Sequence, residues 1–210
     1  MKLLPETELI QTGPVDHADW NYRPLLAFVM RRRYALIRSL LPRDRVDRLL
    51  EVGFGSGVFM PELAEHCKEL YGIDIHTEVQ RVQEHLEHAG VHAALSKQSA
   101  ADKMMFEDGF FDVVVAVSAL EFIDRIDDAA AELARIIAPQ GRLIAVMPRK
   151  SRMLDLALRV ATGEDAEHDY EGRRERVVPA LRKHFDIRRT KSFAPVYTAY
   201  ELAPKDSTAT

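Results

Sequence analysis

The sequence is poor in cysteine and has no long uncharged apolar run. Cys67 is the single cysteine among 210 residues, which excludes an internal disulfide and a metal cluster held by several cysteines and favours a reducing compartment. The opening stretch MKLLPETELI has a proline and acids where a secretion signal needs an apolar core, and no segment approaches the roughly 18 apolar residues of a membrane span. We therefore expect a cytoplasmic protein without a transmembrane segment.

The composition, 47% hydrophobic and 30% charged, fits one compact domain, but the net charge of −4 hides a strong asymmetry. Residues 49–148 contain 17 acids and 7 bases. Residues 20–48 contain 8 bases against 2 acids, and residues 171–191 contain 8 bases against 3 acids. An acidic centre argues against nucleic acid lying across it, so we expect no nucleic-acid partner. The oligomeric state is left open.

The centre of the chain alternates between short apolar runs and helical patterns, which predicts an α/β fold with a parallel sheet and helices on both faces. Strands are expected at 47–52, 68–75, 91–98, 110–118 and 142–148, and helices at 58–68, 77–90 and 127–141. Thr77 is a candidate N-cap and Gly90 a stop for the second of these helices. Residues 185–203 form two extended runs around Pro195, which predict an antiparallel hairpin at a sheet edge.

Two segments fall outside this alternation. Residues 1–45 include a helical apolar stripe surrounded by arginines, made of Leu26, Met30, Tyr34, Ile37 and Leu41. Residues 149–184 follow the fifth strand. We expect both segments to act as lids over the carboxyl ends of the strands of a 46–203 core domain, where open α/β sheets bind ligands, and residues 204–210 to form a flexible tail.

Three glycines, Gly53, Gly55 and Gly57, follow the first strand directly. They let the backbone bend and leave no side chain between it and a ligand. The third glycine comes one residue too early for the dinucleotide fingerprint, so a pyrophosphate is disfavoured. Asp74 ends the next strand, 21 residues after Gly53, where an acid can accept hydrogen bonds from two ribose hydroxyls. The pair predicts a nucleoside site.

At this point the chain resembles the class I S-adenosylmethionine-dependent methyltransferases, over roughly residues 46–148. LLEVGFGSG resembles the first motif, GIDI the second, FEDGFFDVVVAVSALEFI the fourth-strand motif, and ELARIIAPQGRLIAVMP the helix, turn and fifth strand. The resemblance implies a Rossmann-like seven-stranded, mostly parallel sheet and S-adenosylmethionine as cofactor. The cofactor contacts that it implies are Glu51, Gly53, Phe54, Gly55, Gly57, Asp74, Ile75, Ala100, Ala101 and Ser118.

The sequence also departs from the family pattern. The usual adenine-contacting acid falls at Ala100, with Asp102 two residues on, so backbone groups of residues 99–102 are expected to hold the adenine. Phe122 stands where many relatives have a histidine, and no general base is carried over. Weak candidates for a catalytic role are His17, Glu121, His168 and Tyr170.

Other side chains have two interpretations. Tyr22, with Trp20, either staples the N-terminal helix or covers the sulfonium through its ring face. Glu51 contacts the cofactor or accepts backbone hydrogen bonds at its strand end. His85 and His88 are better explained by a solvated helix face than by a metal ion, so no metal site is expected.

The chemistry that these residues predict is transfer of a methyl group to a small-molecule or lipid-like acceptor, mainly by positioning. The two basic segments, if both border the entrance, form a positive rim that favours an anionic acceptor or contact with an anionic membrane surface. Two alternatives remain: a methyltransferase-like module that binds the cofactor without turnover, and a dinucleotide oxidoreductase.

Overall fold

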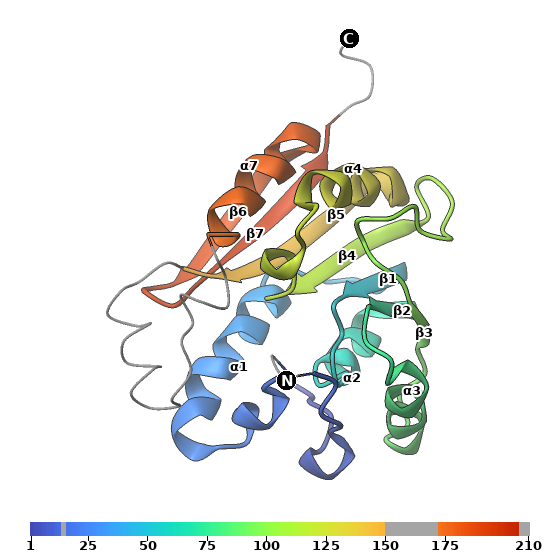
Figure 1. Ribbon diagram of the computed structural model, residues 1–210, viewed down its shortest axis with the longest axis vertical. Coiled ribbons are helices and arrows are strands. Elements are labelled where there is room, and N and C mark those ends of the chain that lie inside the picture. Colours follow the sequence, from blue (N-terminus) through green and yellow to red (C-terminus); the bar gives the residue numbers. More distant parts are fainter. Residues whose placement is uncertain (14–15, 150–171, 206–210) are drawn as a thin grey trace.

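The computed structural model describes residues 1–13, 16–149 and 172–205, and these build one seven-stranded sheet (Figure 1). The strand order is β3-β2-β1-β4-β5-β7-β6. Strands β1 to β5 are parallel, whereas β7 runs antiparallel to both β5 and β6. The strands span β1 Val46–Val52, β2 Cys67–Asp74, β3 Ala94–Lys97, β4 Phe111–Val117, β5 Ile137–Pro148, β6 Phe185–Phe193 and β7 Tyr197–Pro204. The predicted fold class, including the antiparallel hairpin, is confirmed.

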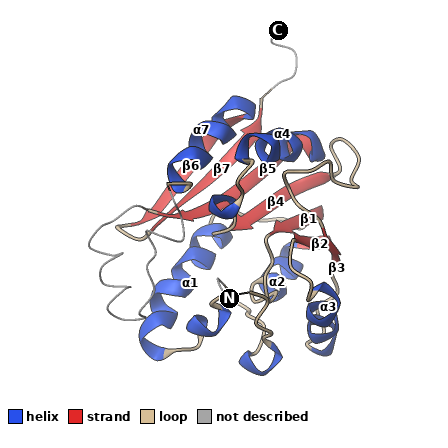
Figure 2. Cartoon of the chain, in the orientation of Figure 1, coloured by secondary structure: helices blue, strands red, loops and turns tan. Residues whose placement is uncertain are grey.

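Helices cover both faces of the sheet (Figure 2). One face packs against α1 (Pro24–Arg38), α2 (Met60–Leu63) and α3 (Val79–His88), and the other packs against α4 (Ile126–Ile136) and α7 (Arg174–His184). Short 3-10 turns are η1 Glu6–Glu8, η2 Ala18–Asn21, η3 Ala64–His66 and η4 Leu120–Phe122.

Strand β4 explains why a continuous apolar run suits the sheet's centre. Successive side chains of a strand point to opposite faces. Val113 and Val115 therefore belong to the core under α1, while Val114 and Ala116 belong to the core under α4 and α7. Both faces are covered, so every residue of this strand from Val113 to Val117 is buried and apolar, and its one polar residue, Asp112, lies near the start of the strand.

The N-terminal stripe docks on the sheet. Tyr34 and Ile37 are buried, and the Tyr34 ring stacks on Phe59 with centroids 4.5 Å apart. The residues before α1 continue over the strand ends, since the Leu4 N–H donates to the Val58 carbonyl at 3.0 Å. None of the described helices has the length and apolarity that crossing a bilayer demands.

Three local expectations need correction. The helix expected over 58–68 is only a turn of α2 and η3, because Cys67 already pairs with Val46 as the first residue of β2. Thr77 is not a cap; Glu78 precedes α3 without a side-chain cap bond, although Gly90 (φ +74°) does end the segment.

The third correction concerns the lid expected at 149–184. Residues 174–184 form α7, whose Val177, Ala180 and Leu181 are buried in the core shared with α4. This part of the segment is a layer of the domain, because an apolar stripe at helical spacing is buried against the sheet. Residues 150–171 of the expected lid lie outside the described part of the chain.

Candidate functional site

The loop after β1 has the backbone that its glycines predict. Gly53, Gly55 and Gly57 all have positive φ, at +73°, +52° and +72°, a region that side chains with a Cβ rarely adopt. A Cβ on Gly53 would lie 2.5 Å from the Cβ of Ala119, at the end of β4. The loop is therefore held in close contact with the neighbouring strand end, and its three glycines add no side chain there.

Asp74 connects the end of β2 to this loop. Its Oδ2 accepts from the Gly55 N–H at 2.8 Å, and its Oδ1 accepts from the Ile75 N–H at 2.7 Å. The His76 N–H makes a third, longer bond to Oδ1 at 3.4 Å. A carboxylate has about four lone-pair sites, so it keeps acceptor capacity for hydroxyl donors. The side chain is 15% exposed, so it stays accessible at the edge of the sheet. Asp74 therefore binds the glycine loop and is not an N-cap of the helix that begins near Thr77.

His76 is a site residue that the sequence reasoning missed. Its Nδ1 accepts from the Glu78 N–H at 3.1 Å, so its Nε2 carries the proton that faces the Gly55 carbonyl at 3.1 Å. The ring also meets Phe54 edge to face at 5.0 Å. His76 thus binds the Gly55 carbonyl while Asp74 binds the Gly55 N–H, and the two side chains lie 3.9 Å apart. The signal in the sequence was only its position two residues after the acid.

The residues expected near an adenine lie at the third strand. Ser99 accepts the Ala101 N–H through its Oγ at 3.2 Å and the Asp102 N–H through its carbonyl at 3.2 Å, so the segment is a tight turn. Asp102 itself pairs with Arg125 on the surface. Ile75 is 71% exposed, which is unusual for an apolar side chain beside a buried strand end.

Glu51 is buried beneath the loop. Burial raises the pKa of Glu51 from 4.5 to about 8; the nearby Asp74 carboxylate also raises it, and Arg33 opposes both. Its Oε2 makes no hydrogen bond to the described residues, so the structure gives no support to the alternative in which backbone groups satisfy that oxygen. Ser118 has a positive φ of 51° and a buried Oγ without a partner in the described part. Both residues present unused polar atoms at the strand ends.

Glu121 follows β4 in η4 and is fully buried. Burial raises the pKa of Glu121 from 4.5 to about 7; its own backbone N–H and the guanidinium groups of Arg174 and Arg33 partly offset the effect. Neither carboxylate oxygen makes a hydrogen bond of normal geometry to a described residue. A carboxyl group that titrates near neutrality at a strand end is a candidate acid or base.

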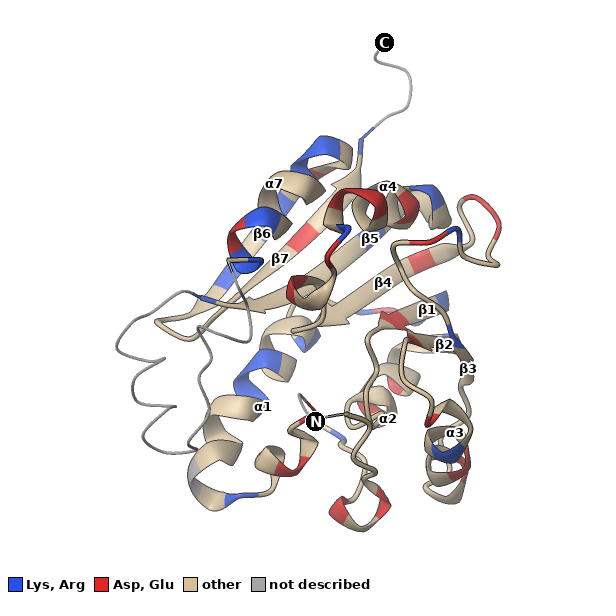
Figure 3. Ribbon diagram, in the orientation of Figure 1, with Lys and Arg blue, Asp and Glu red and all other residues tan. Residues whose placement is uncertain are grey.

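Arg33 and Arg174 come from the two basic segments that the sequence singled out. Arg33 lies on α1 and Arg174 at the start of α7, on opposite faces of the sheet, and basic residues mark both helices (Figure 3). Both guanidinium groups oppose the rise that burial causes in the pKa of Glu121 and in the pKa of Tyr197, a buried residue of β7. One arginine of each segment therefore lies within electrostatic range of Glu121, which follows β4.

The other candidate residues have mainly structural contacts. His17 stacks on Trp20 with ring centroids 4.2 Å apart. Tyr22 donates to the Leu4 carbonyl, and Arg31 lies over its ring at 5.5 Å, which is the stapling role weighed for it. His168 and Tyr170 lie outside the described residues.

Metal ligation is equally unsupported. Nδ1 of His85 lies 3.0 Å from a Glu8 carboxylate oxygen, and its ring centroid is 6.2 Å from that of His88. The described residues contain no group of three or more potential metal ligands.

Comparison with known proteins matches residues 50–145 to the family model of the methyltransferase domain. Sterol 4-C-methyltransferase strm-1 of Caenorhabditis elegans is 34% identical over 98 residues, which are 45% of this chain and 29% of that protein. The chain also spans less than half the length of the other two curated relatives that it matches. The predicted resemblance to methyltransferases is confirmed for this segment.

Solved structures agree on the fold. A S-adenosylmethionine-dependent methyltransferase from Aquifex aeolicus superposes with a TM-score of 0.70 at 16% identity, covering 90% of this chain and 99% of that one. Geranyl diphosphate methyltransferase, in complex with GPP and sinefungin, superposes with a TM-score of 0.67 at 13% identity, covering 97% and 88%. At these identities the likeness extends to the fold, and it confirms the Rossmann-like sheet.

Proposed function

We propose, from the methyltransferase domain that residues 50–145 match, that this chain transfers a methyl group from S-adenosylmethionine to a small-molecule acceptor. One observation carries the proposal: the glycine loop and the Asp74 carboxylate are fixed together by the 2.8 Å bond from the Gly55 N–H. This pairing offers bare backbone and a carboxylate with spare acceptor capacity side by side, which fits a nucleoside with a charged tail.

The residues present fit that cofactor. Asp74 would accept the ribose hydroxyls, and the exposed Ile75 with the buried Ala100 and Ala101 would pack on the adenine. Gly53, Gly55 and Gly57 would let the amino-acid end approach the loop, and Phe54, Glu51 and Ser118 would complete its surroundings. Tyr22 remains a prediction as a cofactor contact, because its hydroxyl already binds Leu4.

When bound, S-adenosylmethionine supplies an electrophilic methyl group, which the acceptor's lone pair takes while the electrons of the broken bond leave with a neutral thioether. The chain's part is to align the acceptor and to exclude water, a contribution that is worth several kcal/mol. An acceptor that carries a proton also needs a base. Glu121 is our choice among the described candidates, because its two carboxylate oxygens are buried and lack partners there.

Calorimetry tests the cofactor half of the proposal. The protein should bind S-adenosylmethionine and its demethylated product, after any copurified molecule is stripped, and should not bind NAD. Asp74→Ala should weaken binding by about tenfold or more, because two ribose hydrogen bonds to a charged group are lost. Asp47→Ala is the matched control, since that acid pairs with Lys68 on the surface, away from the loop. Equal affinities for the two variants would contradict the assignment of Asp74.

A labelled-methyl assay on pools of lipids, glycans and small aromatic molecules tests turnover. Transfer to one pool supports the enzyme and identifies the class of acceptor. Tight cofactor binding with no transfer to any pool would favour a binding module without turnover.

A further inference from the structure

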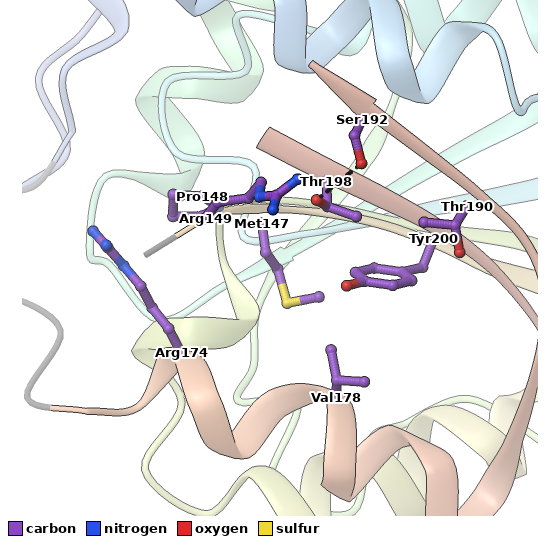
Figure 4. A pocket seen from close by; sticks show the side chains of 9 residues that line it. All are labelled: Met147, Pro148, Arg149, Arg174, Val178, Thr190, Ser192, Thr198 and Tyr200. Atoms are coloured by element: carbon purple, nitrogen blue, oxygen red, sulfur yellow. Dashed lines mark hydrogen bonds between the residues drawn. The ribbon is translucent and has the colours of Figure 1, made fainter. Parts of the chain in front are cut away.

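A pocket of about 470 Å³ lies at the carboxyl end of β5, on the face of the sheet that α7 covers (Figure 4). Arg174 and Val178 of α7 lie on one side, and Met147 and the β6–β7 hairpin lie on the other. Two arginines and four hydroxyl side chains contribute to its wall: Arg149, Arg174, Thr190, Ser192, Thr198 and Tyr200.

The hydroxyl groups form an ordered patch. Thr190 pairs with Tyr200, and Ser192 pairs with Thr198, in consecutive same-face positions of the antiparallel ladder. The Ser192 and Thr198 hydroxyls are 3.2 Å apart. Elsewhere this face of the sheet is apolar and covered by α4 and α7. Among the described residues, this hydroxyl patch offers donors and acceptors that a polar ligand could bind in place of water.

The charges select the sign of that occupant. None of the described residues that line the pocket carries a carboxylate. Two of them, Arg149 and Arg174, are positively charged. Guanidinium forks and hydroxyl donors together match the several oxygens of a phosphate better than the two of a carboxylate. Met147 and Val178 add an apolar strip for the remainder of the ligand.

The pocket adjoins the site described above. Arg174 lines the pocket and also lowers the pKa of Glu121. The Ser118 N–H donates to the Val146 carbonyl at 2.9 Å, one residue before Met147. A molecule whose anionic end sits in the pocket would extend towards the ends of β4 and β5, where Glu121 lies.

We propose that this pocket binds the phosphate or diphosphate group of the methyl acceptor, which makes the acceptor a small phosphorylated molecule with an apolar part. The inference rests on the proposed function, and it specifies the substrate class of the same site. Arg149 and Arg174 hold the charge, the four hydroxyls complete its hydrogen bonds, and Met147 and Val178 contact the apolar part.

The test measures binding of inorganic pyrophosphate and octyl phosphate by calorimetry at constant ionic strength. Both should bind, and octyl phosphate should bind more tightly than inorganic phosphate, which is measured beside them. Arg149→Gln and Arg174→Gln should each weaken binding by ~10–100-fold, the loss of one or two charge-assisted hydrogen bonds. Arg176→Gln, on the same helix but outside the pocket lining, should change nothing. Ser192→Ala, at an exposed position, gives a smaller loss without risk to folding.

Equal affinities of the Arg174→Gln and Arg176→Gln variants, or no binding of either phosphate, would overturn the proposal. Binding that depends on Arg174 only with phosphatidylglycerol vesicles, and not with octyl phosphate, would overturn it in favour of a lipid surface. S-adenosylmethionine binding is measured on every variant and should not change. Failure of the wild-type protein to bind S-adenosylmethionine would refute the proposed function independently of the phosphate result.

Discussion

Replacing Gly53 by alanine tests the contact that shapes the candidate cofactor loop. The backbone at this position has φ +73°, and an added Cβ would lie 2.5 Å from the Cβ of Ala119. Holding an L-residue in the left-handed region costs roughly 1–2 kcal/mol. Forcing carbon atoms well inside their ~3.5–4.0 Å contact distance adds about 1–3 kcal/mol of overpacking. We expect Gly53→Ala to lower the free energy of unfolding by about 2–5 kcal/mol.

The chain contains a matched control for the first of these two terms. Gly90 has almost the same φ, +74°, but a Cβ there would meet nothing within 4 Å. Gly90→Ala should therefore cost only the roughly 1–2 kcal/mol of backbone strain. For a chain of this length about 1 kcal/mol corresponds to about 2–4 °C in Tm, so the two variants should differ by several degrees.

Thermal unfolding of four proteins measures the effect: wild type, Gly53→Ala, Gly90→Ala, and the double variant Gly53→Ala with Ala119→Gly. The double variant removes the colliding methyl group and should recover most of the difference between the two single variants. Calorimetry on the same set should show weakened S-adenosylmethionine binding for Gly53→Ala alone. If Gly53→Ala melts at the same temperature as Gly90→Ala, the close approach of the loop to Ala119 is wrong.

Three shorter predictions concern buried groups. The pKa of Glu121 is raised in the folded state from 4.5 to about 7, so the folded state binds more protons than the unfolded state, and the free energy of unfolding falls as pH rises from about 4.5 through 7. In urea unfolding, Glu121→Gln should show a flatter dependence of this free energy on pH, and a slope equal to that of the wild type would contradict the prediction. Burial raises the pKa of Cys67 to about 11, so thiol reagents should modify it only after unfolding. His76→Phe keeps an aromatic ring but loses the bond to Gly55, and it should weaken S-adenosylmethionine binding severalfold in calorimetry, whereas Asp47→Ala should not.

Local pattern was enough to predict most of the sheet. The apolar run of β4, the glycines after β1 and the acid at the end of β2 each follow from short-range rules on burial, φ and strand spacing. The same rules failed where length or packing decided the outcome. The nine residues between Gly57 and Cys67 form only the short α2 and η3 turns, because β1 pairs with β2 from Val46 and Cys67 onwards.

The role of α7 shows why the lid boundary was wrong. Its sequence is basic and contains Pro179, and both features are typical of an exposed segment. However, Val177, Ala180 and Leu181 share one face of the helix and are buried against α4. Only the contact with another helix distinguishes a lid from a core layer, and that contact joins segments distant along the chain.

The sequence by itself determined the order of elements, the bare loop and the acid beside it, because each depends on neighbours a few residues away. Only the tertiary structure decided that Arg33 and Arg174 both lower the pKa of Glu121, that His76 supports Gly55, and that four hydroxyls align across β6 and β7. Such arrangements depend on strand register and on which helix covers which face, and long-range packing of the whole sheet fixes both.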